Sequence, residues 1–304
     1  MNATYANAVR PQFRPNKPAT EPATELGNEL ERRIAQMQQQ LDAARAEADQ
    51  GRAAARKVEQ ELQLASRLQR DFLPKRLPNH SRARFNQLYR PCGHVSGDLY
   101  DVRRLDEHYA GVYLLDAMGH GMPAALLAMF MHNALKTKTI DPDGCYRLLT
   151  PGESVAELND TLLAQRLTGQ FATAVYATVD CDGGKVEFAR AGHPMPMLLR
   201  GRGQATTVEE PGGTGALLGV MADEVFEPCR VQLQPGDRML FFTDGVESAF
   251  PDADGCPCMD QWRKAVHERR HLSADALIAD LSLLLSERDC DDDFTLVTVE
   301  MTEG

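Results

Sequence analysis

The sequence of 304 residues lacks several features that would assign it to a specialised class of protein. Its seven cysteines include no C-x-x-C pair, which argues against a disulfide framework and predicts reduced thiols. No apolar run approaches the roughly 20 residues that a membrane-spanning helix needs. The N-terminal segment also lacks the apolar core of a signal peptide. We therefore expect a cytoplasmic protein without a membrane segment.

Basic residues are scarce as well: 33 Lys and Arg stand against 44 Asp and Glu, a formal net charge of −11. The excess of acid falls from Pro78 onward, where 34 acidic residues accompany 20 basic ones. An acidic globular part argues against nucleic-acid binding through a broad basic face. A protein partner is the alternative that we expect. Apolar residues make up 43% of the chain, which is enough for a full core.

The chain divides into three zones, which we interpret as a disordered tail (1–24), a regulatory coiled-coil helix (25–77) and a globular domain (78–304). Within residues 25–72 no proline occurs, and apolar residues recur at spacings of three and four, as in a coiled-coil seam. The seam consists of Ile34, Met37, Leu41, Ala44, Ala48, Gly51, Ala55, Val58, Leu62 and Ala65. It predicts a homodimer through residues 25–72. The alternative is a single amphipathic helix that packs on the domain.

The seam pattern changes near the end of this helix. Leu68, Phe72, Leu73 and Leu77 leave the seam, and Pro74 and Pro78 end the helix. A change of register at the entry to a domain is a place where a conformational signal can arrive. The alternative is a helix stop that only packs on the core.

From residue 78 onward the pattern predicts an α+β fold. Strand patterns occur near 85–90, 97–105, 109–117, 171–180, 185–191, 196–200, 229–234, 238–243 and 294–301. Helical periodicity occurs near 122–139, 153–167, 259–270 and 273–288. Short turns such as Asp182-Gly183-Gly184 indicate antiparallel hairpins. Because the helices do not follow every strand, a sandwich is favoured over a doubly wound parallel sheet.

Aspartates stand at four places where an apolar run begins or ends: Asp98, Asp116, Asp244 and the run Asp291–Asp293. Each motif alone is an ordinary turn dipeptide. Carboxylates that a fold gathers together repel one another and are costly to desolvate, unless a cation lies between them. Hard cations such as Mg²⁺ and Mn²⁺ prefer oxygen ligands. The four motifs together predict metal-assisted hydrolysis of a phosphate.

The segment from Gly119 to Ala125 follows the second motif and predicts a helix start, with Pro123 in its first turn. Such a helix N-terminus favours anions. Between its two glycines, His120 could donate to a phosphate or to a metal-bound water, or it could serve only the structure of the loop.

The order of these motifs resembles that of the PPM (type 2C) metal-dependent serine/threonine phosphatases, specifically the bacterial SpoIIE/RsbU-type branch. The stretches that carry the resemblance are Ser96–Asp101, Asp116–Ala125, Arg190–Pro196, Thr243–Glu247 and Asp292–Thr295, with the helix end Leu68–Pro74 before them. Ser96, Leu99 and Ala117 depart from the family pattern, and all the expected acidic ligands are present.

The resemblance implies an αββα sandwich that holds two Mn²⁺ or Mg²⁺ ions at one end. Asp116 would bridge the two ions. Asp98 and the carbonyl oxygen of Ala117 would serve one ion, and Asp244 and Asp292 the other.

Two further aspartates have less definite roles under this resemblance. Asp293 is the alternative ligand to Asp292, because a single sequence does not decide between neighbours, and Asp101 could lie behind the ligands. His193 could support the leaving alkoxide or only hold the turn from Gly192 to Pro196.

The function that the resemblance implies is dephosphorylation of phosphoserine or phosphothreonine on a regulatory partner protein. The usual partner in this family is a phosphorylated STAS-domain antagonist of an anti-sigma factor, in a partner-switching pathway. Two metal ions about 4 Å apart can activate water for such an attack. The alternative is a catalytically weak coiled-coil signalling scaffold that binds the same kind of partner.

Overall fold

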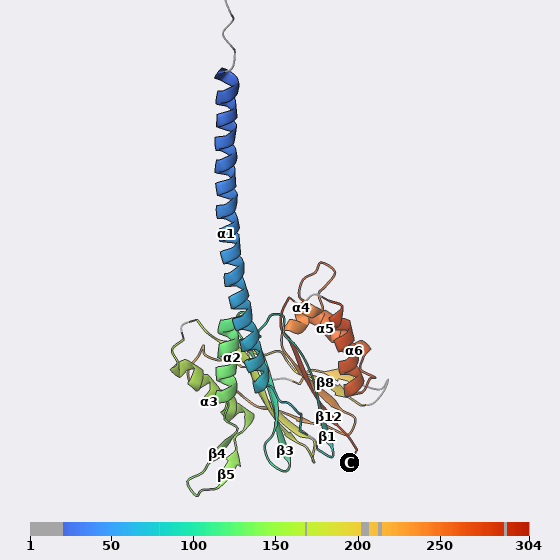
Figure 1. Ribbon diagram of the computed structural model, residues 1–304. Coiled ribbons are helices and arrows are strands. Elements are labelled where there is room, and N and C mark those ends of the chain that lie inside the picture. Colours follow the sequence, from blue (N-terminus) through green and yellow to red (C-terminus); the bar gives the residue numbers. More distant parts are fainter. Residues whose placement is uncertain are drawn as a thin grey trace, which may run out of the picture. The chain divides into compact units, whose positions relative to one another are not determined.

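The computed structural model describes residues 21–78, 80–167, 169–201, 207–211, 215–288 and 291–303, and it divides into two units, 1–60 and 61–304 (Figure 1). Most of the expected disordered tail, residues 1–20, lies outside the described residues. Residues 21–24 are helical, so the helix begins earlier than the sequence pattern predicts. Among the described helices none combines the length and the apolar character needed to cross a membrane.

Helix α1 (Glu21–Phe72) confirms the long N-terminal helix that the sequence predicts. In the first unit every side chain from Leu26 to Gln60 is exposed. The exposed residues include four large members of the apolar stripe, Ile34, Met37, Leu41 and Val58. An apolar stripe at coiled-coil spacing is therefore open along the helix.

The second unit contains two five-stranded sheets whose strand pairings are all antiparallel. The first sheet has the order β10 (Cys229–Gln232), β7 (Lys185–Ala191), β6 (Ala172–Asp180), β3 (Tyr109–Ala117), β2 (Asp98–Arg104). The second sheet has the order β1 (Ala83–Arg90), β12 (Phe294–Met301), β11 (Arg238–Phe242), β8 (Met197–Arg200), β9 (Thr207–Glu209).

Three apolar layers define the sandwich. One lies between the sheets, where Leu114 and Val175 of the first sheet share a cluster with Phe241 and Val297 of the second. Another joins the first sheet to α2 (Met122–Ala134) and α3 (Pro151–Ala164). The last joins the second sheet to α5 (Met259–Glu268) and α6 (Ala274–Ser286), with the short α4 (Gly245–Ala249) beside them. This arrangement confirms the αββα sandwich, and Figure 1 shows the helices on its two outer faces.

The helix predicted over 122–139 is wrong at its C-terminal end. It stops at Ala134, and Leu135 takes an extended conformation as the C-cap. The following β4 (Lys138–Ile140) pairs with β5 (Tyr146–Leu148) in a small separate hairpin. The β-branched Thr139 and Ile140 suit a strand, and this local preference outweighs the continuing helical pattern.

Candidate metal centre

The centre begins with two aspartates on neighbouring strands of the first sheet. Asp98 is the first residue of β2, and the antiparallel register sets it directly opposite Asp116, near the end of β3. Opposed residues on adjacent strands have Cβ atoms only about 5 Å apart. Asp98 is 2% exposed. The hairpin between β2 and β3 therefore brings two of the predicted ligands together at one end of the sandwich.

The second sheet fixes one oxygen of Asp98. Oδ2 of Asp98 accepts hydrogen bonds from the hydroxyl of Thr243, at 2.7 Å, and from the hydroxyl of Thr295, at 2.5 Å. The amide of Thr295 also donates to the hydroxyl oxygen of Thr243, at 3.1 Å. Since Thr243 follows β11 and Thr295 lies in β12, Asp98 joins the two sheets. Hydrogen bonds to a charged acceptor are the stronger kind, so this oxygen is firmly placed.

The remaining carboxylates converge on this pair, and their mutual repulsion changes their acidity. Burial, followed by Asp244, Asp292 and Asp293, raises the pKa of Asp116 to about 8. Burial and the charge of Asp116 also hold the pKa of Asp98 well above its ordinary value. These groups are more easily ionised if a cation offsets their charges.

The pKa values of the other two predicted ligands, Asp244 and Asp292, are raised as well. Desolvation and the charge of Glu247 raise the pKa of Asp244. Desolvation, then the charges of Asp244 and Asp293, raise the pKa of Asp292 against a lowering hydrogen bond from the Asp293 amide. Both aspartates are exposed, so they lie at the rim of the centre and not beneath it.

Two glycines allow this convergence. A Cβ atom at Gly97 would lie 2.9 Å from the carbonyl oxygen of Ala117, and one at Gly245 would lie 1.9 Å from the carbonyl oxygen of Asp293. Any larger residue at Gly245 would push Asp244 away from the Asp292–Asp293 segment. The backbone therefore approaches closely at the two places where the predicted ligands must meet.

Asp292 and Asp293 occupy different positions in the centre. Asp293 accepts hydrogen bonds from the amide of Cys92 at Oδ1, 2.7 Å, and from the amide of Gly97 at Oδ2, 2.9 Å. Both of its oxygens thus hold the loop before β2. Asp292 accepts from the Asp293 amide at 2.8 Å through Oδ1.

The donor set fits a hard divalent cation. It consists of carboxylate oxygens, which are the ligands that Mg²⁺ and Mn²⁺ prefer. Within the described residues no group of three or more His, Cys, Asp or Glu side chains is arranged to hold an ion as it stands.

The other predicted site residues lie apart from the cluster. Asp101 sits on the opposite face of β2 from Asp98, and its carboxylate accepts from Nε of Arg103 at 2.5 Å. Nε2 of His132 in α2 lies 4.0 Å from the same oxygen. The structure therefore does not bring Asp101 to the ligands, because strand residues three apart point to opposite faces.

The two predicted histidines, His193 and His120, differ in their exposure to solvent. His193 is 1% exposed, and its Nδ1 shares a 2.8 Å hydrogen bond with the hydroxyl of Thr173, the residue paired with Asp116 across β3 and β6. Burial and the charge of Arg190 lower the pKa of His193 to about 3, so the ring is neutral at ordinary pH. His120 is exposed, beside the Gly121 N-cap of α2. His193 thus has a supporting position, and His120 lies at the surface.

Sequence reasoning missed the residues that hold the ligands. Thr243 and Thr295 occur inside the quoted motifs, but nothing in one sequence shows that their hydroxyl groups reach Asp98. Gln69 of α1 was also missed. This buried side chain donates through Nε2 to the carbonyl of Ser96, at 2.7 Å, and accepts at Oε1 from the amide of Ser96, at 2.9 Å. The only available signal was a polar residue within an apolar helix end.

Comparison with known proteins identifies relatives of this chain. The family model described as stage II sporulation protein E (SpoIIE) matches residues 106–302. The chain is 26% identical over 193 residues to the phosphoserine phosphatase RsbP of Bacillus subtilis, covering 62% of this chain and 45% of RsbP. It is 24% identical over 245 residues to the phosphoserine phosphatase RsbU of the same organism, covering 80% of this chain and 70% of RsbU.

The chain is therefore shorter than some of these relatives. It spans 45% of RsbP and 33% of the protein IcfG of Synechocystis, to which it is 27% identical over 210 residues. Among solved structures, the SiaA-PP2C domain of Pseudomonas aeruginosa aligns with a TM-score of 0.68 at 22% identity, covering 82% of this chain and 98% of that domain. The RsbU and RsbW domains of Rv1364c from Mycobacterium tuberculosis align with a TM-score of 0.61 at 24% identity, covering 74% and 62%. The fold is thus PP2C-like.

Proposed function

The chain belongs to the family of stage II sporulation protein E (SpoIIE), and from this membership we propose that it is a metal-dependent protein serine/threonine phosphatase. The observation that carries the proposal is the set of carboxylates around Asp98 and Asp116, which raise one another's pKa at one end of the sandwich. Buried carboxylates of this kind are costly to a fold and are kept where function requires them. RsbP and RsbU, which are similar to this chain, are named phosphoserine phosphatases.

In this proposal the centre holds two Mn²⁺ or Mg²⁺ ions. Asp116 contributes to both, Asp98 and the Ala117 carbonyl to one, and Asp244 and Asp292 to the other. Asp292 is preferred to Asp293 by the family resemblance, and Asp293, which accepts from the amides of Cys92 and Gly97, is the alternative ligand. When bound, such ions supply a nucleophilic water at neutral pH and offset the charge on the attacked phosphoryl group.

In this proposal, other residues of the chain position the metal ligands and the incoming phosphate. The hydroxyl groups of Thr243 and Thr295 hold one oxygen of Asp98 in place and favour its ionised form, against the burial and the charge of Asp116 that raise its pKa. His193 stays neutral and holds Thr173 next to Asp116, so it is a positioning residue in this proposal. The exposed His120 stands beside the N-terminus of α2, where an incoming phosphate meets unpaired amide donors.

The proposed substrate is a phosphorylated regulatory protein of the STAS class. An apolar surface on the helix that follows the Asp116 loop supports a protein substrate. Pro123, Leu126, Phe130 and Leu167, which we call the α2 patch, line a cavity of about 310 Å³ between α2 and the end of α3. Leu126 and Leu167 are both about half exposed. The chain runs from Asp116 through a short loop into α2, so the helix that carries this patch starts from the loop of a proposed ligand.

Regulation through α1 is also proposed. Two contacts connect the end of this helix to the centre. Gln69 pairs with both peptide groups of Ser96, two residues before Asp98. Phe72 packs edge-on against His132 of α2, with ring centroids 5.9 Å apart. A shift of this helix end would therefore move the loop that carries Asp98.

The exposed seam of α1 supports a homodimer through residues 25–72. Substituting Ile34 and Leu41 with Lys together would place charges in the seam. Analytical ultracentrifugation should then show a monomer, whereas an unchanged mass would remove the dimer from the proposal.

The experiment that tests the enzyme assignment is hydrolysis of a small aryl phosphate by the full chain with Mn²⁺. Metal-dependent release of phosphate supports a phosphatase. No release at millimolar Mn²⁺, in protein that still binds a STAS partner, would favour the signalling scaffold.

A further inference from the structure

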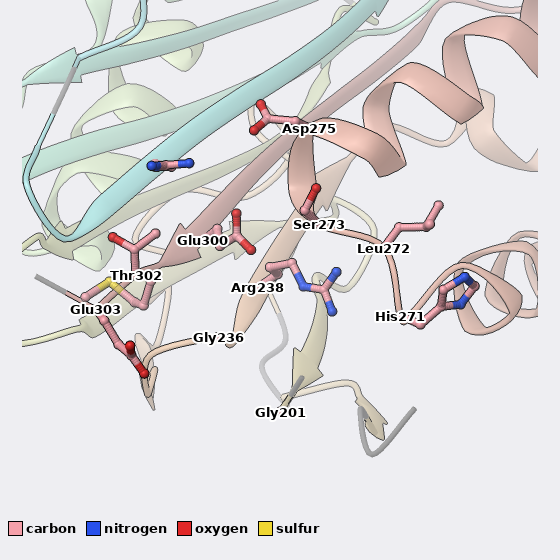
Figure 2. A pocket seen from close by; sticks show the side chains of 12 residues that line it. Gly201, Gly236, Arg238, His271, Leu272, Ser273, Asp275, Glu300, Thr302 and Glu303 are labelled. Atoms are coloured by element: carbon pink, nitrogen blue, oxygen red, sulfur yellow. The ribbon is translucent and has the colours of Figure 1, made fainter. Parts of the chain in front are cut away.

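A second polar cavity lies at the end of the second sheet where β11 begins and β12 ends. Its volume is about 400 Å³, and its lining includes Arg84, Arg238, His271, Ser273 and Asp275. Figure 2 shows Arg238 between Glu300 of β12 and the segment from His271 to Ser273 that leads into α6. A cavity of this size is large enough for a small metabolite.

The unusual feature of this cavity is the state of Arg238. The residue is 3% exposed, and only one of its nitrogen atoms, Nη2, donates a hydrogen bond, to the carbonyl of Arg270 at 2.5 Å. Its Nε and Nη1 atoms are buried and have no hydrogen-bond partner among the described residues. Unpaired buried donors on a charged group are costly, so this guanidinium is missing acceptors that a ligand can supply.

Acidic groups near Arg238 offset part of the cost of burying its charge. Burial lowers the pKa of Arg238, against the opposing charges of Glu300 and Asp237. Glu300 is paired across the strands with both Arg238 and Arg84. No ion pair within 4.0 Å joins Glu300 to Arg84 or Arg238 in the described part of the chain. The carboxylate thus lowers the cost of burying the charge without satisfying the free nitrogen atoms.

The N-terminus of α6 faces the same cavity through Ser273 and Asp275. The hydroxyl oxygen of Ser273 accepts from the amide of Ala276 at 3.3 Å, which leaves the earlier amides of the first turn for another acceptor. A planar guanidinium beside a helix N-terminus suits an oxyanion. The acidic residues Asp275, Glu300 and Glu303 in the lining favour an oxyanion that also carries hydroxyl donors.

This cavity is separate from the candidate metal centre. Arg238 is the first residue of β11, and Asp244 follows the other end of that strand. At about 3.3 Å per residue, the strand separates the two by roughly 15–20 Å. Binding at one place can therefore be measured without the other.

We propose that the cavity at the N-terminus of α6 is a binding site for a small hydroxyl-bearing oxyanion, of the phosphate or carboxylate class, anchored by Arg238. The ligand would give acceptor oxygens to Nε and Nη1 of Arg238 once that buried side chain turns toward the cavity, with Arg84 adding positive charge and His271 a ring nitrogen at the rim. This site is additional to the proposed phosphatase and does not depend on it.

The test is isothermal titration calorimetry on the full chain after removal of metal with EDTA, with inorganic phosphate and citrate as separate probes. Binding of either probe supports the site, and the comparison assigns the phosphate or the carboxylate class. Arg238→Gln should weaken that binding about tenfold or more, because two charge-assisted hydrogen bonds are lost.

Two further variants make the result decisive. Arg84→Gln changes an exposed residue of the same cavity, so it should weaken binding even if the Arg238 variant does not fold. Arg230→Gln removes an exposed arginine of β10 outside the cavity and should leave binding unchanged. The proposal is overturned if neither probe binds at millimolar concentration, or if the two cavity arginine variants bind as well as the unmodified chain.

Discussion

The hydroxyl of Thr295 in β12 donates a 2.5 Å hydrogen bond to the carboxylate of Asp98 in β2, so two residues 197 positions apart connect the two sheets at the candidate metal centre. Thr243 donates to the same oxygen. The pKa of Asp98 is raised by burial and by Asp116, and these two hydroxyl groups act in the opposite direction. The two hydroxyl groups of the second sheet thus favour the ionised form that a cation needs, while burial and Asp116 still hold the pKa above its ordinary value.

The first prediction concerns this bond. Thr295→Val keeps the shape of the side chain but removes the donor, so Mn²⁺ should bind about tenfold more weakly, because a hydrogen bond to a charged group is lost. The Mn²⁺ concentration for half-maximal aryl phosphate hydrolysis measures this. The control is Thr298→Val on the same strand, since the Thr298 hydroxyl is buried without a partner in the described structure. Equal loss in both variants would contradict the assigned role of Thr295.

The second prediction concerns pH. At pH 6 the Asp116 carboxyl, whose pKa is raised to about 8, is mostly protonated and must release its proton to bind a cation. The affinity for Mn²⁺ should therefore rise by about tenfold per pH unit from pH 6 to pH 8 and then level off. Calorimetry in buffers of different ionisation enthalpy would measure the proton release directly. An affinity that does not change over this range would show that Asp116 is not a ligand.

The same shift affects folding of the metal-free chain. The folded-state pKa of Asp116 exceeds its ordinary value of 3.8, so ionisation of this group costs free energy of folding as pH rises from about 4 to 8. Added Mn²⁺ should consequently raise the melting temperature more at pH 8 than at pH 6.

Much of this architecture follows from local patterns, and the rest depends on contacts across the fold. Apolar runs ending at Asp116 and Asp244 predicted the strand ends correctly, because side-chain alternation is a local property. The same alternation separates Asp101 from Asp98 and puts it on one face with Arg103, so this position was also open to a local prediction. The partner from another element was not, since His132 of α2 approaches the Asp101 carboxylate only in the folded structure.

Long-range partners explain the other omissions. Gln69 precedes Ser96 by 27 residues, and their paired hydrogen bonds exist only because the end of α1 packs beside the loop before β2. The hydrogen bonds of Asp293 with the backbone amides of Cys92 and Gly97 also join residues about 200 positions apart, so one sequence does not reveal them.

The third prediction concerns Gln69. Gln69→Leu removes both hydrogen bonds to Ser96 and leaves its buried peptide groups unpaired, at a cost of about 1–3 kcal/mol for each group. The loop before Asp98 should loosen, and the Mn²⁺ concentration for half-maximal activity should rise at least about tenfold. Gln60→Leu, an exposed change in the same helix, is the matched control. Equal Mn²⁺ dependence in the two variants would show that α1 does not act on the centre through Gln69.

The fourth prediction separates protein substrates from small ones. Leu126→Asp places a charge in the α2 patch, so kcat/KM for a phosphorylated STAS protein should fall about tenfold or more, because an apolar contact is lost and a charge is desolvated. Hydrolysis of an aryl phosphate should be unchanged. Leu283→Asp, at an exposed leucine of α6, is the control. Equal loss with both substrates would contradict docking at this patch.

The most direct test of the account compares the full chain with its Asp116→Asn variant in Mn²⁺-dependent release of phosphate from a phosphoserine-containing STAS protein. Asp116 is predicted to bind both ions, so the variant should lose at least about a hundredfold in kcat/KM while circular dichroism shows the same fold. Equal rates of phosphate release by the two proteins would contradict the proposed centre.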